Sequence, residues 1–215
     1  MNGRQKNEID AIVRSTLRTT GSRRATATPP SSRRHPWSVA GFACGTDEII
    51  STPATANRYV PALTAKTPLA WDVPVIAQVV GANATARTLV SGGKATLDLP
   101  GCGAVVVHAG QSGYYRTLYA PKQFAAIKAG FASLAPIDQL GIMDDVSALG
   151  MAGLQAASDY LDLAQATPAD AAPQVWGGIA DAFAALDRYD DGDPARQSAL
   201  RGFAIARLTP VFDRI

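Results

Sequence analysis

The hydrophobic period of the sequence changes near Pro121. Before this proline, apolar residues alternate with their neighbours along one face of the chain, at Trp71, Val73, Val75, Ala77 and Val79. After it, apolar residues recur every three or four positions, at Phe124, Ile127, Phe131 and Leu134. A period of two indicates a strand and a period near 3.6 indicates a helix. The sequence therefore predicts an α+β fold, with a small antiparallel β-sandwich followed by an α-helical region.

Turn residues divide the first part into short strands. Glycine and proline occur at Ser91-Gly92-Gly93, Pro100-Gly101 and Gln111-Ser112-Gly113, where they permit or preset the φ angles of tight turns. Pro74 lacks a backbone N–H, so it suits an edge or the start of a strand. Short strands with tight turns favour an antiparallel arrangement. The expected strands cover residues 71–80, 86–90, 95–99, 104–109 and 114–119.

Helical periodicity continues to the end of the chain. Four further apolar patterns follow, at Ile142-Val146-Leu149, Leu154-Ala157-Leu161-Ala164, Val175-Ile179-Phe183-Leu186 and Leu200-Phe203-Ala206. Pro136 precedes the first of them, and Asp193-Pro194 forms a cap and first-turn proline for the last. Short links between consecutive helices predict antiparallel helix pairs.

The N-terminal segment differs from the rest in composition. Residues 1–34 carry eight Lys/Arg and two acidic residues, and only Ile9 to Leu17 suits a short helix. A segment with little apolar surface does not offset its chain entropy, so we expect low order over most of residues 1–56. The basic residues lack interleaved aromatics, which favours a tail over a nucleic-acid site, and the composition is also typical of a transit peptide. The predicted domains are 1–56, a β-sandwich over 57–120, and a truncated start of a helical domain over 121–215.

Neither a membrane span nor a secretory signal is predicted. No run of about 18 apolar residues occurs, and no apolar stretch follows the charged start of the chain. These absences favour a soluble, cytoplasmic protein. Cys44 and Cys102 have no metal-binding spacing, and we expect two unpaired thiols.

The inventory of metal ligands is small. A zinc hydrolase needs several imidazole or carboxylate ligands and a carboxylate that takes the proton of water. The chain has two histidines, His35 and His108, and two glutamates, Glu8 and Glu48, and it has no His-Glu-x-x-His. We therefore assign no catalytic, cofactor-binding or metal-binding residue, and we expect His108 to be a core or rim histidine.

Three other motifs are incomplete. Gly110 to Gly113 departs from a nucleophile elbow because Tyr114 takes the place of the last glycine, and Gly92-Gly93-Lys94 lacks two features of a phosphate-binding loop. Both are interpreted as turns, the second as a hairpin turn. Asp187 to Asp193 lacks two calcium ligands and is interpreted as an acidic loop between helices. Asp144 and Asp145, adjacent on a helix, point in different directions.

A resemblance to a known family depends on the order of these elements. Trp71-Asp72-Val73-Pro74-Val75 opens a strand, Gly113-Tyr114-Tyr115-Arg116-Thr117-Leu118-Tyr119 follows, and a helix carries Asp138 to Leu149. This order resembles the zinc aminopeptidases typified by aminopeptidase N and puromycin-sensitive aminopeptidase. The resemblance covers about residues 57–215, with Asn57 to Val60 as a weak echo of a preceding strand. Thr117-Leu118 and Gly141 depart from the family pattern.

The resemblance implies a non-catalytic C-terminal fragment of such an enzyme. In the family, an upstream domain bears the His-Glu-x-x-His zinc site and a Gly-x-Met-Glu-Asn loop, and this chain contains neither motif. Zinc thus belongs to the parent enzyme, and a peptide substrate or a missing catalytic domain would be a partner only in the complete enzyme. The resemblance implies structural roles for Trp71, Tyr114 or Tyr115, an ion pair for Arg116, and Asp144 or Asp145 as an acceptor. The alternative is a stand-alone protein-interaction module on the same scaffold, and neither reading expects nucleic-acid or membrane binding.

Overall fold

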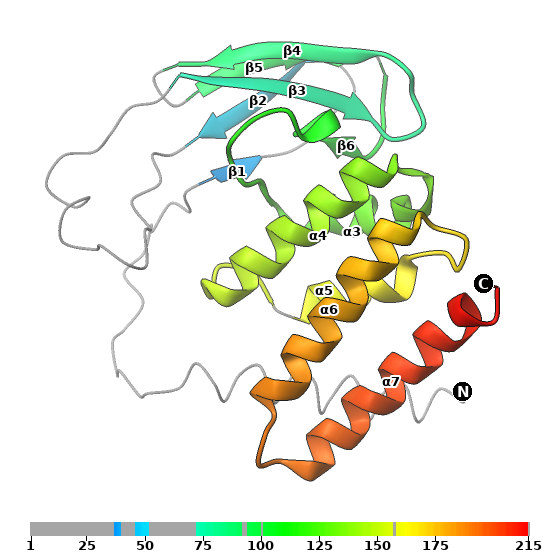
Figure 1. The fold of residues 1–215 in the computed structure, drawn as a ribbon. Coiled ribbons are helices and arrows are strands. Elements are labelled where there is room, and N and C mark those ends of the chain that lie inside the picture. Colours follow the sequence, from blue (N-terminus) through cyan, green and yellow to red (C-terminus); the bar gives the residue numbers. More distant parts are fainter. Residues whose placement is uncertain are drawn as a thin grey trace, which may run out of the picture. The chain divides into compact units, whose positions relative to one another are not determined.

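A computed structural model of the chain describes residues 37–39, 46–51, 72–91, 94–99, 101–156 and 158–214. Strands precede five α-helices in this part of the chain, which confirms the predicted α+β class (Figure 1). The residues divide into two compact units, with the boundary between Gln155 and Ala156. The proposed limits at residues 56 and 120 remain predictions. Ile9 to Leu17, Asn57 to Val60, Trp71 and His35 lie outside the described residues.

The first unit contains two small sheets. One has the order β5-β2-β1-β7, from strands β1 (Trp37–Val39), β2 (Thr46–Ser51), β5 (Lys94–Asp98) and β7 (Leu118–Tyr119). The other has the order β4-β3-β6, from β3 (Val73–Val79), β4 (Thr85–Val90) and β6 (Val105–Val106). All pairs are antiparallel except β1 with β7. Strands β1 and β2 lie within residues 1–56, where the sequence analysis predicted no strand.

Strand β3 follows the predicted period of two. Val73, Val75, Ala77 and Val79 are buried, and the residues between them are exposed or half-buried. Pro74 pairs with Leu89 of β4, whereas β6 pairs with β3 only at Gln78 and Val79. The missing N–H of Pro74 therefore falls near the start of the strand, as predicted.

Three strand predictions needed correction. Strands β4 and β5 belong to different sheets, so they do not form the hairpin that was predicted around Gly92-Gly93-Lys94. The predicted strand over 104–109 is only β6, followed by a bridge from His108 to Ile76 and the short 3-10 helix η1 (Ala109–Gln111). The predicted strand over 114–119 shrinks to β7, because the residues before Leu118 contact a helix instead.

Cys102 is part of a disulfide, so the expectation of two unpaired thiols was wrong. The chain has one other cysteine, Cys44, which lies outside the described residues. The separation of two cysteines in a sequence does not show whether a thiol is oxidised, so their spacing could not predict this bond.

Two helices complete the first unit. Helix α3 (Pro121–Ala129) ends at Gly130, and the short η2 (Phe131–Ser133) follows it. Helix α4 (Pro136–Met151) starts at the predicted proline. Both bury their apolar faces, and the most deeply buried side chains of this unit include Ile127, Phe131 and Ile142.

The second unit consists of α5 (Ser158–Ala166), α6 (Pro173–Tyr189) and α7 (Pro194–Phe212). Helices α6 and α7 pack side by side with opposite directions (Figure 1), as predicted. The Phe183 and Phe203 rings meet edge to face between them, 5.6 Å apart. Asp193 caps α7 by accepting the N–H of Arg196, in agreement with the predicted cap. No helix among the described residues meets the length and hydropathy needed to cross a bilayer.

Candidate functional site

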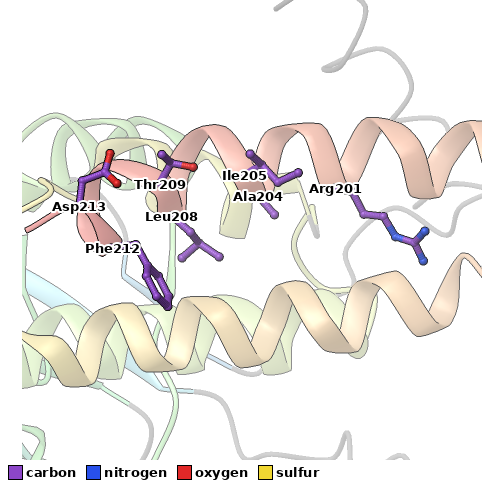
Figure 2. A pocket seen from close by; sticks show the side chains of 7 residues that line it. All are labelled: Arg201, Ala204, Ile205, Leu208, Thr209, Phe212 and Asp213. Carbon is purple, nitrogen blue, oxygen red and sulfur yellow. The ribbon is translucent and has the colours of Figure 1, made fainter. Parts of the chain in front are cut away.

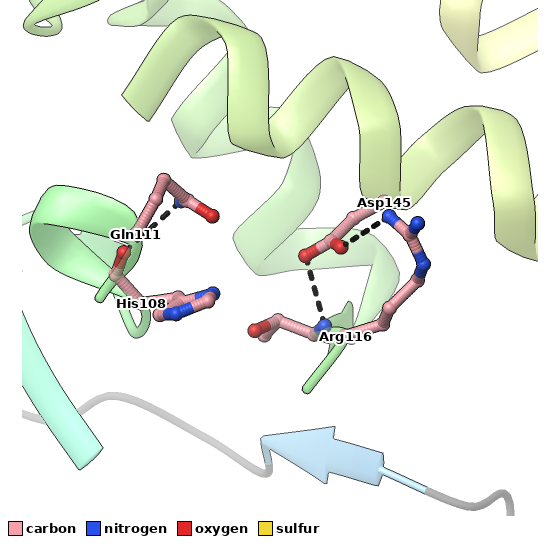
Figure 3. Close-up of polar contacts among 5 residues, drawn as sticks. His108, Gln111, Arg116 and Asp145 are labelled. Carbon is pink, nitrogen blue, oxygen red and sulfur yellow. Dashed lines mark hydrogen bonds and ion pairs between the residues drawn. The ribbon is translucent and has the colours of Figure 1, made fainter. Parts of the chain in front are cut away.

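A cluster of polar contacts in the first unit lies where α4 faces the segment from His108 to Tyr119 (Figure 3). Asp145 of α4 is 5% exposed and accepts the Thr117 N–H through Oδ2 at 2.9 Å. Its Oδ1 accepts from Arg116 Nη1 at 3.2 Å, which forms the ion pair that the resemblance implied. Asp144 is exposed, so the two neighbouring carboxylates do point in different directions.

Near the start of α4, the turn that follows His108 also contacts this helix. Gly110 has a φ of 75°, which glycine tolerates readily, and its N–H donates to Asp138 Oδ1 at 2.7 Å. Gln111 has a φ of 50° and donates from Nε2 to the His108 carbonyl oxygen at 3.0 Å. A Cβ on Gly141 would overlap the Gln111 side-chain amide, so the absent side chain at Gly141 makes room for this turn.

His108 is a structural histidine in this cluster. It is 5% exposed, and the Gly113 N–H donates to its Nε2 at 2.8 Å. This contact places the proton of the neutral ring on Nδ1. The Tyr115 ring stacks on the imidazole at 4.2 Å. Nδ1 has no hydrogen-bond partner among the described residues, and burial lowers the pKa of His108.

Two tyrosines of the cluster form hydrogen bonds with the backbone of Val107, the residue after β6. The Tyr115 hydroxyl donates to the Val107 carbonyl oxygen at 3.3 Å, and the Tyr119 oxygen accepts the Val107 N–H at 3.0 Å. Burial raises the pKa of Tyr115 to about 12 and raises that of Tyr119 further, so both stay neutral. Tyr114 is fully exposed, so of the two neighbouring tyrosines it is Tyr115 that packs.

The chemistry available to this cluster is limited. Burial raises the pKa of Asp145 to about 6, while its contacts with Thr117 and Arg116 act in the opposite direction. The Asp145 carboxylate is occupied by two donors, and the described cluster presents no activated serine, cysteine or lysine nucleophile. The cluster fastens α4 to the segment that enters β7.

The residues present do not fit the zinc ion of the enzymes that the sequence resembles. No group of three His, Cys, Asp or Glu side chains with metal-binding geometry occurs in the part of the chain that the structure describes. The Nε2 of His108 already accepts the Gly113 N–H, and His35 lies outside the described residues. The 215-residue sequence has no His-Glu-x-x-His.

The other predicted motifs have structural roles where they are described. Gly110 to Gly113 forms η1 and the turn after it. In the acidic loop, Asp187 pairs with Arg201 through two hydrogen bonds of 2.7 and 2.8 Å, and Asp193 caps α7. The sequence predicted only a turn at Gln111 and a departure from the family pattern at Thr117, and it gave neither residue a place in this cluster. The departure of Gly141 from the same pattern was the one hint that concerned the Gln111 side chain.

A separate feature of the second unit is a hollow lined by residues of α7 and the residue after it (Figure 2). Ile205 and Phe212 are 65% and 77% exposed, and Leu208 lies between them on the same helix. The hollow encloses about 520 Å³, and its lining residues are Arg201, Ala204, Ile205, Leu208, Thr209, Phe212 and Asp213.

Comparison with known proteins extends the resemblance seen in the sequence. A comparison with curated proteins finds no match. The family model described as the ERAP1-like C-terminal domain matches residues 104–215, which is slightly more than half of the chain. This range begins just before β6 and contains the cluster around Asp145 and all three helices of the second unit. The chain belongs to the ERAP1-like C-terminal domain family, a domain of M1 zinc aminopeptidases.

Proposed function

We propose that this chain is a non-catalytic C-terminal region of a zinc aminopeptidase. Its role is to support the catalytic domain and to form part of the wall around the peptide, while a separate domain removes N-terminal amino acids. The observation that carries the proposal is the family match over residues 104–215 in a sequence without His-Glu-x-x-His. The polar cluster around Asp145 supports the same role because its donors and acceptors bind one another.

The first test concerns the chain alone. We expect the purified protein to hold no stoichiometric zinc by mass spectrometry of the metal and to release no arylamine from aminoacyl arylamides. The physical reason is that a hydrolytic zinc site needs three converging protein ligands and a general base. One equivalent of zinc, together with turnover that a chelator abolishes, would contradict the proposal.

The second test asks whether the chain binds a catalytic region and increases its rate of peptide hydrolysis. The DNA upstream of this coding sequence is searched, on the same strand, for an encoded His-Glu-x-x-His motif. The catalytic region that carries the motif is then expressed with and without the chain. We expect binding by calorimetry and faster hydrolysis of longer peptides when the chain is present. Arg116→Glu, which opposes Asp145 with a like charge, serves as the impaired variant, and Lys122→Glu on exposed α3 surface serves as the matched control. Absence of both the motif and the binding would contradict the role in a catalytic assembly.

A second candidate is a stand-alone interaction module. The exposed apolar hollow on α7 favours it, because contiguous apolar surface on a folded domain often marks a binding site. The upstream sequence separates the two candidates, since only the first requires a catalytic domain.

A further inference from the structure

His108 holds the turn that follows it through both its ring and its backbone. The ring Nε2 accepts the Gly113 N–H at 2.8 Å. The carbonyl oxygen accepts the Gln111 backbone N–H at 2.9 Å and the Gln111 side-chain amide at 3.0 Å (Figure 3). A Cβ added to Gly113 would lie 3.1 Å from the same Nε2 and 2.5 Å from Cε1 of Tyr115. The Gly113 backbone is therefore packed against both rings.

The Gly113 bond requires a neutral imidazole. A backbone N–H can only donate, so Nε2 must accept, whereas both nitrogens of a protonated ring carry hydrogen and can only donate. Turning the ring over does not restore the bond, because Nδ1 of the cation is a donor too. We propose that protonation of His108 opens the turn over residues 111–115 while the rest of the first unit stays folded. The turn is then a pH-sensitive switch, and this proposal does not depend on the role in a peptidase.

The closed turn offers a cationic ring no compensation for its burial. His108 is 5% exposed, and its Nδ1 has no hydrogen-bond partner among the described residues. A protonated ring in this place would direct one N–H at the Gly113 donor and leave the other without an acceptor, away from water. Burial accordingly lowers the pKa of His108. Opening the turn returns the ring to water, which hydrates the cation.

The ionisable groups near the ring oppose this effect only in part. Helix α4 and strand β3 pack against η1. Asp138 of α4 favours the cation through its negative charge, but its Oδ1 already accepts a backbone N–H of the turn. Asp145 of the same helix is bound by two donors of the segment that enters β7. On β3, the residue bridged to His108 is Ile76, which does not titrate. Tyr115 stays neutral, because burial raises its pKa to about 12.

Contacts on either side of the turn keep the opening local. The N–H groups of Gly110 and Thr117 donate to Asp138 and Asp145, both on α4. Residues 111–115, between these two contacts, are exposed or half-buried. Their release uncovers little apolar surface, so it costs much less than unfolding of the unit. The segment can therefore open between two fixed ends.

Hydrogen exchange of the whole chain, followed by NMR from about pH 7.5 to about pH 5, tests the proposal. The protection of the Gly113 amide is expressed relative to an unstructured peptide at the same pH. It should be nearly constant well above the ordinary imidazole pKa of 6.5. Below this value it should fall by up to about tenfold per pH unit, until the folded-state pKa is reached. The Thr117 amide lies outside the turn and should keep its protection.

Two variants and one spectrum assign the effect to the ring. In His108→Gln, the side-chain oxygen can accept the Gly113 N–H and does not titrate, so the pH dependence of Gly113 protection should disappear. Asp145→Asn is the matched control, because it removes a second group that titrates in this range, with a pKa of about 6. It should leave the pH dependence at Gly113 unchanged. The nitrogen NMR signals of the wild-type ring at neutral pH should show the tautomer with hydrogen on Nδ1, and this readout needs no variant.

Several results would overturn the switch. One is Gly113 protection that does not change with pH, and another is a pH dependence that persists in His108→Gln or disappears in Asp145→Asn. Equal losses of protection at Gly113 and Thr117 would mean that the whole unit unfolds. A neutral ring with its hydrogen on Nε2 would mean that the Gly113 bond does not form, and either of these two results also refutes the proposal.

Discussion

The carboxylate of Asp145 holds the backbone of Thr117, a residue 28 positions earlier in the chain, through a buried hydrogen bond of 2.9 Å. This contact fixes the distance between α4 and the segment that enters β7, because a backbone N–H can move only with the chain that carries it. The ion pair with Arg116 adds to the contact from the neighbouring residue. Half of the Arg116 side chain is exposed, so water screens that pair and the Thr117 bond is the stronger constraint.

Removing the acceptor should destabilise the first unit. Asp145→Ala leaves the buried Thr117 N–H without a partner, and we expect the free energy of unfolding to fall by about 2–3 kcal/mol. Asp145→Asn keeps an acceptor oxygen in nearly the same place and should cost about 1 kcal/mol. Urea unfolding followed by circular dichroism measures both values. Asp144→Ala, at the exposed neighbour, is the control and should change stability by less than about 0.5 kcal/mol. Equal losses for Asp144→Ala and Asp145→Ala would contradict the role of Thr117.

The free energy of unfolding should depend on pH through the protonation of Asp145. Burial raises the pKa of this carboxyl group from 3.8 to about 6, so the folded state binds more protons than the unfolded state between these values. The free energy of unfolding should therefore fall as pH rises through this window, by roughly 2–3 kcal/mol for this one group. The measurement is the difference in unfolding free energy between the wild type and Asp145→Asn, whose amide does not titrate. A difference that grows with pH would show that Arg116 and Thr117 lower this pKa more than burial raises it.

The protonation of His108 should make stability change with pH in the opposite direction to that of Asp145. Burial lowers the pKa of its imidazole below 6.5, so the folded state favours the neutral ring. The stabilisation from this preference is complete above about pH 6.5 and is lost as pH falls through the folded-state pKa. His108→Gln does not titrate in this range, so the stability of wild type relative to this variant should decrease on acidification. A relative stability that stays constant from neutral to mildly acidic pH would mean that His108 is not held in the neutral form.

The parts of the fold that the sequence predicted depend on patterns within single segments. The period of β3, the prolines that start α4 and α7, and the Asp193 cap are local properties and were read correctly. The family resemblance, and not spacing, implied an ion pair for Arg116 with Asp144 or Asp145 as an acceptor, and the structure shows that the acceptor is Asp145.

What the sequence did not predict depends on contacts between distant segments. Strands β1 and β2 are short and follow no sustained pattern, and their place in a sheet comes from pairing with β5 and β7. The strand expected over 114–119 is short because Asp145 binds the Thr117 N–H, which an uninterrupted strand would direct to a neighbouring strand.

Gly141 and Gln111 should show energetic coupling. Gly141→Ala places a methyl group where the Gln111 amide lies, so Gln111 must move and lose its bond to the His108 carbonyl oxygen. We expect a loss of about 1 kcal/mol in the wild-type background, as the net of this loss and a gain in helix propensity. In a Gln111→Ala background the same change should stabilise the protein by about 0.5–1 kcal/mol, because alanine favours helix over glycine. A double-mutant cycle measured by urea unfolding gives the coupling, and additive effects would contradict the predicted overlap.

Arg207 should be the most sensitive surface-facing residue of the second unit. From α7 it donates to the carbonyl oxygens of Ala164 and Thr167, at 3.2 and 2.6 Å, at the C-terminal end of α5. Its guanidinium also lies 5.4 Å from the Trp176 ring centre on α6, so one side chain contacts all three helices.

Two substitutions of Arg207 distinguish the contribution of its positive charge to stability from that of its guanidinium geometry. Arg207→Lys keeps a cation but cannot reach both carbonyl oxygens with the planar fork, and we expect a loss of about 1–2 kcal/mol in the free energy of unfolding. Arg207→Ala also removes the contact with Trp176 and should cost about 2–4 kcal/mol. Urea unfolding followed at the helical band in circular dichroism measures both, with Arg214→Ala, at an exposed position after α7, as the control. If the Arg207→Lys protein has the same free energy of unfolding as the wild type, the carbonyl contacts contribute little to stability. The position of α7 against α5 would then depend on apolar packing alone.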